Sequence, residues 1–301
     1  MKDNARTETG RQQKQISSGL RNALSVDVED YFHVSALAGA IPRSSWDSME
    51  YRVEANTHKL LELFGDFGAS ATFFVLGYVA QRSPELIREI HAAGHEVACH
   101  GLSHKLIYRQ TPAEFEEETR VSKELLEDII GAGVSGYRAA SWSITQESLW
   151  ALDIICKLGF RYDSSIFPIR HDRYGIPGAS QHAGMISSPD GHEIVEFPPS
   201  TVSLPGVRLP VAGGGYFRIF PYSLTRFGLR RINKQAGQPF MFYLHPWEVD
   251  PEQPKFDTSR LSRFRHYTNL DQTELRLRRL LGEFQCTSAK NVLADLGLLN
   301  P

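Results

Sequence analysis

The feature that most constrains the fold is a regular alternation of short apolar runs with longer segments of helical periodicity. Residues 23–28, 71–76 and 95–99 are short apolar runs that predict strands. Apolar residues recur at helical spacing from 54 to 67, and a Ser-Pro pair opens a second predicted helix at 83–93. Strands that alternate with helices in this way indicate an α/β protein with a mainly parallel sheet.

The alternation continues to the C-terminus and has one interruption. It predicts helices at 111–130, 145–158, 221–236 and 271–284, and strands at 136–138, 160–163 and 239–244. The interruption is the segment 175–218, where Gly, Pro and short strand-like pieces predict a β-rich insertion. We therefore expect one α/β domain over residues 22–301, with a sheet closed or nearly closed into a barrel, after a disordered segment at 1–21.

The charge and cysteine content exclude several classes of protein. The chain has 33 Lys and Arg against 35 Asp and Glu, so it carries no basic excess that would indicate nucleic-acid binding. No apolar run is long enough for a membrane span, and the polar N-terminus lacks the apolar core of a secretory signal. The three cysteines form no disulfide pattern, and Cys99 is expected to be a small buried residue. These features predict a cytoplasmic protein.

The stretch "HEVACHGLSH" at residues 95–104 contains three histidines with the potential to bind a metal. His95 and His100 are five residues apart, which is the wrong spacing for the H-E-x-x-H motif of metalloproteases. His100 and His104 are four apart, so both side chains can lie on one side of a helical turn. We predict that this second pair binds metal.

Chemically active side chains collect where the predicted strands end. In α/β barrels and doubly wound sheets, active sites form in the loops at the carboxyl ends of the strands. The residues at these ends are Asp27, Glu29, Asp30, His100, His104, Arg138, Trp142, Asp163 and His245. We predict a catalytic site at this rim, because it brings together carboxylates, two histidines at metal-binding spacing, an arginine and a further histidine.

The stretches "SVDVEDYF", "HGLSH", "YRAASW", "YDSS" and "LHPW", in this order on alternating elements, resemble the five motifs of the NodB-type polysaccharide deacetylases. With "GGGYFR" and "FYLHPWEVDPEQP", the chain resembles the branch found in bacterial exopolysaccharide loci beside the PEP-CTERM/exosortase system. The resemblance covers the chain from Ala23 onward. It implies a distorted (β/α) barrel of about seven strands and a divalent metal, usually zinc, held by a carboxylate and two histidines. It also implies hydrolysis of N-acetyl groups on amino sugars.

The resemblance assigns a role to each matching residue. Asp27 corresponds to the catalytic base, Arg138 to the arginine that orients it and keeps it ionised, and His245 to the general acid. His100 and His104 correspond to the metal-binding pair. Trp142 corresponds to the aromatic wall of the substrate groove, to which we add Tyr216 and Trp247 as candidates. The loop of Asp163 is implied to support the acid histidine, although a turn-forming role is the alternative.

Two departures from the family pattern leave questions open. The family has adjacent aspartates where this chain reads D-V-E-D, so the metal carboxylate is either Glu29, on the strand face of Asp27, or Asp30, if the chain turns at Val28. Ala140 replaces a proline of the third motif. Cobalt, nickel and iron also suit the predicted ligands.

Other roles and functions compete with these assignments. Asp27 could cap a helix, and Arg138 and His245 could be structural residues. The alternative functions are an allantoinase-like hydrolase of a small cyclic amide and an inactive carbohydrate-binding protein. As a deacetylase, the chain is expected to act on an amino-sugar polysaccharide or oligosaccharide in the cytoplasm, near the inner face of the membrane.

Overall fold

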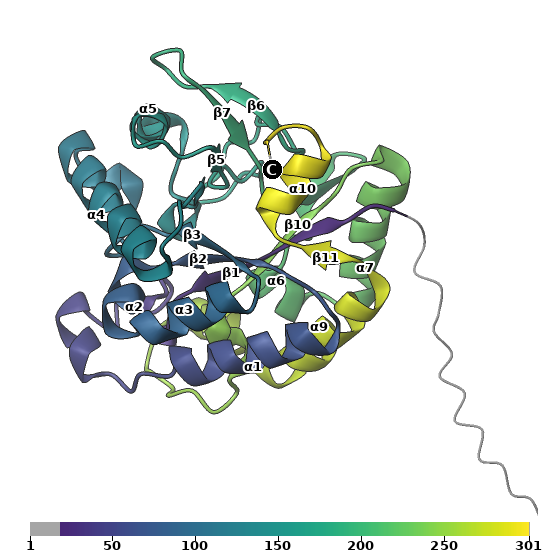
Figure 1. Cartoon of the computed structure of the whole chain (residues 1–301). Coiled ribbons are helices and arrows are strands. Elements are labelled where there is room, and N and C mark those ends of the chain that lie inside the picture. Colours follow the sequence, from purple (N-terminus) through teal and green to yellow (C-terminus); the bar gives the residue numbers. More distant parts are fainter. Residues whose placement is uncertain (1–18, 301) are drawn as a thin grey trace, which may run out of the picture.

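The computed structural model describes residues 19–300, and its centre is a curled, mostly parallel sheet (Figure 1). Seven strands lie parallel in the order β10-β1-β2-β3-β4-β5-β7, which confirms the predicted α/β class. Their bounds are β1 Asn22–Val28, β2 Thr72–Val75, β3 Glu96–Cys99, β4 Gly136–Tyr137, β5 Tyr162–Asp163, β7 Glu193–Glu196 and β10 Met241–Leu244. The antiparallel β6 (Gly184–Ser187) extends the sheet beside β7, and β11 (Cys286–Thr287) pairs with the start of β1.

The segment 175–218 is not simply an insertion. Its strand β7 pairs in parallel with β5 and so belongs to the main sheet, which corrects the sequence prediction. The remaining strands of the segment are β6 and a separate hairpin formed by β8 (Thr201–Leu204) and β9 (Val207–Pro210). Periodicity alone could not separate β7 from its neighbours, because a four-residue strand carries too little pattern.

The free edge of β10 is covered by backbone that follows β7 and the hairpin. The Tyr243 N–H donates to the Ala212 carbonyl at 2.7 Å, and Gly213 forms a parallel bridge with Tyr243. Gly213 has φ of 127°, and a Cβ at this position would lie 1.9 Å from the Tyr243 carbonyl oxygen, so only glycine permits this approach. Among residues 19–300 no strand pair closes the ring, and the sheet is a half-barrel completed by these contacts.

Helices cover the outer face of the sheet (Figure 1). Their bounds are α1 Val53–Asp66, α2 Gly77–Arg82, α3 Pro84–Ala92, α4 Pro112–Ile130, α5 Trp150–Lys157, α6 Gly214–Ile219, α7 Tyr222–Arg231, α8 Arg260–Tyr267, α9 Leu270–Glu283 and α10 Ala289–Asp295. Short 3-10 turns lie at Tyr31–His33, Arg43–Ser48, Ile107–Arg109, Ala140–Trp142, Gln146–Ser148 and Pro246–Val249, and a π turn at Ile232–Ala236. None of the helices in the described part of the chain is both long and apolar enough to cross a bilayer.

Several elements differ from the sequence prediction. The long helix α4 begins as expected, with Thr111 and Glu114 forming a reciprocal capping box. Helices α2, α6, α8 and α10 and strand β11 were not predicted, since each is short and α8 is dominated by polar residues. The predicted disorder at 1–21 lies mostly outside the described residues, and residues 19–21 lead directly into β1.

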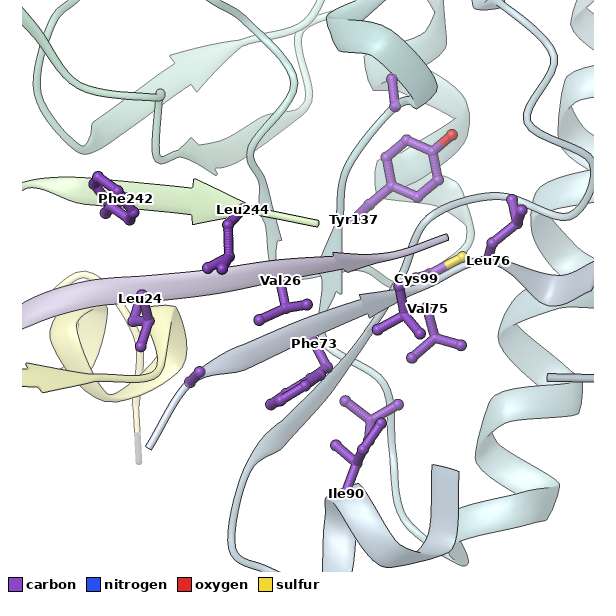
Figure 2. Close-up of a cluster of buried hydrophobic side chains, with 14 of the residues drawn as sticks. Leu24, Val26, Phe73, Val75, Leu76, Ile90, Cys99, Tyr137, Phe242 and Leu244 are labelled. Atoms are coloured by element: carbon purple, nitrogen blue, oxygen red, sulfur yellow. The ribbon is translucent and has the colours of Figure 1, made fainter. Parts of the chain in front are cut away.

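The alternation of side chains along the strands separates the core from the site. Leu24 and Val26 of β1 and Phe73 of β2 pack outward in the main core, where Ile90 of α3 also lies (Figure 2). Cys99 is fully buried in the same core, as predicted, and burial raises the pKa of its thiol to about 11. Because successive residues of a strand face opposite sides, Asp27 points away from this core, into the barrel interior.

Candidate active site

Three side chains form a group with the composition of a metal site. Glu29 follows β1 and His100 follows β3, while His104 lies in the loop beyond. One potential ligand atom from each lies within 4.8 Å of the others. His100 places Nδ1 2.8 Å from the Arg138 carbonyl oxygen, a contact in which Nδ1–H donates and Nε2 remains free to bind a metal.

The environment of Glu29 fits a cation. Its Oε2 is buried and lies 2.6 Å from His104 Nε2, and no other polar group of the described residues is its hydrogen-bond partner. Burial alone raises the pKa of the Glu29 carboxyl, but His104, His245 and His100 together lower it below its usual value. A buried carboxylate beside two imidazoles that point to the same space is the donor set of a catalytic divalent-metal site with open positions.

The backbone around His104 corrects one part of the sequence analysis. The two histidines do not lie on a helical turn, because residues 100–106 form a loop. Gly101 has φ of 73° and His104 has φ of 54°, so the loop reverses and returns His104 toward His100. The ring centroids of the two histidines are 5.6 Å apart. His100 and His104 therefore lie close together, but through a loop and not through a helical turn.

Asp30 does not join this group. One carboxylate oxygen accepts a hydrogen bond from the Tyr31 N–H at 2.8 Å, and the other accepts from the N–H groups of Arg52 and Val53 at 2.6 and 2.8 Å. Burial raises the pKa of this carboxyl to about 6, although the backbone hydrogen bonds oppose the shift. Asp30 therefore caps the turn at Tyr31–His33 and anchors the start of α1.

Asp27 and Arg138 form a buried ion pair. The Asp27 Oδ1 lies 2.6 Å from Arg138 Nη1, and both side chains are almost completely buried. The guanidinium also donates to the hydroxyl groups of Ser25 and Ser164, and it lies 4.6 Å from the ring centroid of Trp142. The arginine therefore holds the Asp27 carboxylate in one orientation, and only Oδ2 remains free to face the cavity.

His245 lies across the cavity from the metal-type group. Its Nε2 is 3.8 Å from Asp27 Oδ2 and 3.5 Å from Glu29 Oε1. On the other side of the ring, Nδ1 lies 2.7 Å from Glu248 Oε1. Burial alone lowers the pKa of His245, but Glu248, Glu29 and Asp27 raise it to about 9. The imidazole can therefore hold a proton on Nε2, where that proton faces the site.

Glu248 and Arg218 support His245, and neither is among the site residues predicted from the sequence. Arg218 Nε lies 2.6 Å from Glu248 Oε2, and its remaining N–H groups donate to the carbonyls of Arg265, His266 and Thr268. Burial raises the pKa of Glu248, but Arg218 and His245 together lower it below its usual value. A signal was present, because "HPWE" begins a 3-10 turn in which the fourth side chain returns to the first residue.

Asp163 does not support the acid histidine, contrary to what the resemblance implied. Its carboxylate accepts from the Ser165 hydroxyl at 2.5 Å and shares a hydrogen bond with Glu196. Both carboxyls are fully buried, and burial raises the pKa of each. A proton shared between them avoids two buried negative charges. Within residues 19–300 no ion pair joins Asp163 to a histidine.

A cavity of about 1210 Å³ joins these groups. Its lining includes Asp27, Glu29, His100, His104 and His245 and the three predicted groove residues Trp142, Tyr216 and Trp247. Trp247 is only 4% exposed and is stacked between the rings of His245 and His266, so it mainly holds the imidazole in place. Trp142 is nearly buried with φ of 57°, and Tyr216 is half-buried.

His33 also lines the cavity. It is buried at the turn that Asp30 caps, and its Nδ1 accepts a hydrogen bond from the Asp30 N–H at 2.8 Å. Its Nε2 therefore carries the proton of the neutral ring, and this atom is buried without a partner. Burial lowers the pKa of this imidazole well below its usual value.

Two family models match the chain, one after the other. Residues 44–162 match the family described as polysaccharide deacetylase. Residues 164–294 match a domain of unknown function, and this segment contains β10, His245, Glu248 and Arg218. Asp27 and Glu29 lie before both matches. The site is therefore built from three successive stretches of the chain.

Curated relatives resemble parts of this chain. A peptidoglycan deacetylase of Helicobacter pylori is 34% identical over 116 residues, which cover 38% of each chain. A chitooligosaccharide deacetylase of a Bradyrhizobium species is 30% identical over 99 residues, which cover 33% of this chain and 43% of the relative. The chain thus spans about two fifths of the length of these relatives.

Two solved structures share the fold. A Mycobacterium smegmatis structure assigned to the polysaccharide deacetylases has a TM-score of 0.59 at 18% identity, over 94% of both chains. The allantoinase Puue gives the same TM-score at 16% identity, over 94% of this chain and 91% of the other. The fold alone does not separate these two activities. The stretch that matches the polysaccharide deacetylase model, residues 44–162, brings His100, His104, Arg138 and Trp142 to the site.

Proposed function

We propose that this chain is a metal-dependent carbohydrate N-deacetylase, which removes N-acetyl groups from amino sugars of a bacterial exopolysaccharide or its precursor. The observation that carries the proposal is the placement of Glu29, His100 and His104 at one cavity with the Asp27–Arg138 pair and His245. The exopolysaccharide assignment rests on the motifs that resemble the branch beside the PEP-CTERM/exosortase system.

The metal ligands in this proposal are Glu29, His100 and His104, and zinc is the first candidate. A divalent ion bound there would supply Lewis acidity and lower the pKa of a coordinated water to about 7. The remaining chemistry belongs to side chains of the chain itself. Asp27, held by Arg138, accepts the proton of the water that attacks the acetamide carbon, through its free Oδ2.

His245 is the proposed general acid. An amide nitrogen leaves only after protonation, so the reaction needs a proton donor on the side of the leaving amine. Nε2 of His245 faces the cavity and Nδ1 is held by Glu248, so the proton for transfer is the one on Nε2. Its raised pKa keeps this proton in place at neutral pH.

The size of the cavity favours a carbohydrate over a small cyclic amide. Small-molecule sites usually occupy about 300 to 1,000 Å³. The cavity here measures about 1210 Å³, and Trp142 and Tyr216 are among the aromatic residues of its lining. The inactive alternative is disfavoured because the proposed base, acid and ligands are all present at one cavity.

The direct test is acetate release from N-acetylglucosamine oligomers by metal-depleted protein, with and without added zinc. We expect release to depend on zinc and to be lost in His104→Ala, which removes a ligand. If protein that binds zinc releases no acetate from any oligomer, the deacetylase proposal fails. Allantoin would then be the next substrate to test.

Replacing Glu248 with glutamine should reduce kcat/KM by about 10- to 100-fold. This is the usual cost of removing a carboxylate that orients a functional histidine. Protonated His245 is the acid, and this form is lost as the pH rises through its pKa of about 9. Without the Glu248 charge that pKa falls, so the alkaline limb of the kcat/KM profile should move down by about 1 to 2 pH units. The measurement is the pH profile of acetate release.

Asp163→Asn is the matched control for this variant. It alters a buried carboxyl that contacts Ser165 and Glu196, so the alkaline limb should stay at the wild-type pH. A limb that moves in Asp163→Asn and stays fixed in Glu248→Gln would contradict the role given to Glu248.

A further inference from the structure

The cavity lining carries an excess of positive charge beyond the groups used in the proposed reaction. Four arginines line it outside the metal and acid–base groups, namely Arg43, Arg109, Arg173 and Arg265. Within residues 19–300 no carboxylate oxygen lies within ion-pair distance of any of these guanidinium groups. The chain as a whole has a formal charge of −2, so this excess is local.

The acidic groups of the lining do not balance these arginines. Asp27 is paired with Arg138, and Glu29 faces three imidazoles. Asp172 lies 2.9 Å from His171, but that imidazole is neutral because its pKa is lowered. Among the described residues, Asp172 and Glu147 are therefore the two lining carboxylates that no cation balances, against four arginines. Lys105 also lines the cavity, but it is paired with Glu118 at 2.7 Å.

Two of the arginines lie on the wall formed by the segment after residue 163. Both Arg173 and Arg265 act on the imidazole of His171, whose pKa is lowered by burial and, in part, by these two charges. His171 stacks on Tyr174 with ring centroids 3.8 Å apart. The Tyr174 hydroxyl meets that of Tyr216 at 3.4 Å. This wall thus combines aromatic faces for sugar rings with two guanidinium groups.

The other two arginines belong to the wall that carries the metal-type group. Arg43 donates to the Ser103 carbonyl and stacks over Trp46 at 4.6 Å, so its side chain is held in place beside the loop of His104. Arg109 is exposed at the end of the 3-10 turn that follows the same loop. Unpaired guanidinium groups therefore line the cavity on both walls.

We propose that the substrate is an acidic oligosaccharide, in which the N-acetylated amino sugar is flanked by carboxylate or phosphate groups that these four arginines bind. Guanidinium groups form paired, charge-assisted hydrogen bonds with carboxylates and phosphates, and a neutral glycan offers no such partner. This proposal rests on the proposed deacetylase function and specifies its substrate class.

The test compares acidic and neutral substrates of equal length. Hyaluronan hexasaccharide, in which glucuronate alternates with N-acetylglucosamine, is compared with the neutral hexa-N-acetylchitohexaose. Diacetylchitobiose 1-phosphate is compared with diacetylchitobiose, so that carboxylate and phosphate recognition are told apart. We expect kcat/KM to be about 10-fold or more higher for the acidic member of at least one pair, and to fall with added salt only for that member.

The variants are Arg173→Gln/Arg265→Gln and Arg43→Gln/Arg109→Gln. Each should lower the acidic-to-neutral ratio of kcat/KM by about 10-fold. The control is Arg161→Gln/Arg279→Gln, which makes the same change in net charge at exposed positions outside the cavity and should leave the ratio unchanged. Equal turnover of acidic and neutral substrates, with ratios that the cavity variants do not alter, would overturn the proposal.

Calorimetric binding of hyaluronan hexasaccharide and of the phosphorylated disaccharide separates this proposal from the proposed function. One outcome is that no substrate yields acetate, but an acidic ligand binds and the cavity variants lower its affinity. The acidic-ligand site then stands and the deacetylase proposal fails. If acetate is released from hexa-N-acetylchitohexaose and neither acidic ligand binds more tightly than its neutral partner, the deacetylase proposal stands and the acidic-substrate proposal fails.

Discussion

Replacing Asp27 with asparagine should reduce kcat/KM for acetate release by about 10² to 10⁴-fold, because the amide cannot accept the proton of the attacking water. The same change leaves the fully buried Arg138 guanidinium without a counter-charge. Removing one partner of a buried ion pair typically costs about 3 to 5 kcal/mol of folding free energy. We therefore expect two losses, measured by acetate-release kinetics and by urea denaturation.

The double variant Asp27→Asn/Arg138→Gln separates these two effects. It removes both charges, so part of the lost unfolding free energy should return, whereas activity should stay as low as in Asp27→Asn. A single variant that keeps more than about a tenth of wild-type activity would show that Asp27 is not the base. Recovery of activity in the double variant would show that misplacement of Arg138, rather than loss of the base, caused the defect.

The second large effect concerns the metal carboxylate. Glu29→Gln keeps the shape of the side chain but removes its charge. We expect the affinity for zinc to fall by more than about 100-fold, because loss of a residue that only hydrogen-bonds a metal ligand already costs about 10- to 100-fold. Acetate release without added zinc should disappear in parallel. Zinc content after dialysis and chelator competition would measure the effect.

Asp30→Asn is the matched control, since Asp30 was the alternative ligand. One of its oxygens accepts from both Arg52 and Val53, and asparagine can replace only part of this set. An unsatisfied buried N–H costs about 1 to 3 kcal/mol, so this variant should be less stable but should still bind zinc. Loss of zinc in Asp30→Asn and its retention in Glu29→Gln would make Asp30 the ligand.

The segment that matches a domain of unknown function gains a physical role from the contacts around His245. It contributes β10, which delivers His245, and the Glu248–Arg218 pair that holds the imidazole. It also carries Arg173 and Arg265 on one wall of the cavity. The segment that matches the polysaccharide deacetylase model lacks these groups, so the proposed acid and one wall of the cavity depend on the second segment.

Much of the fold was predictable because it is recorded in local patterns. Short apolar runs, capping residues such as Thr111, and glycines at helix ends specify where each strand and helix lies. The regular alternation then restricts the chain to a parallel α/β sheet, and the carboxyl ends of parallel strands share one rim. The strand ends alone therefore predict that Asp27, His100, Arg138 and His245 lie near one another.

Only the tertiary structure decides the features that depend on how the backbone turns and on contacts between distant residues. The choice between Glu29 and Asp30 depends on the conformation after Val28, where Asp30 turns to cap the backbone at Arg52 and Val53. Glu248 and Arg218 are 30 residues apart, and no local pattern links them. A sequence records which side chains a segment buries, whereas the partner of each buried charge is set only when the segments pack together.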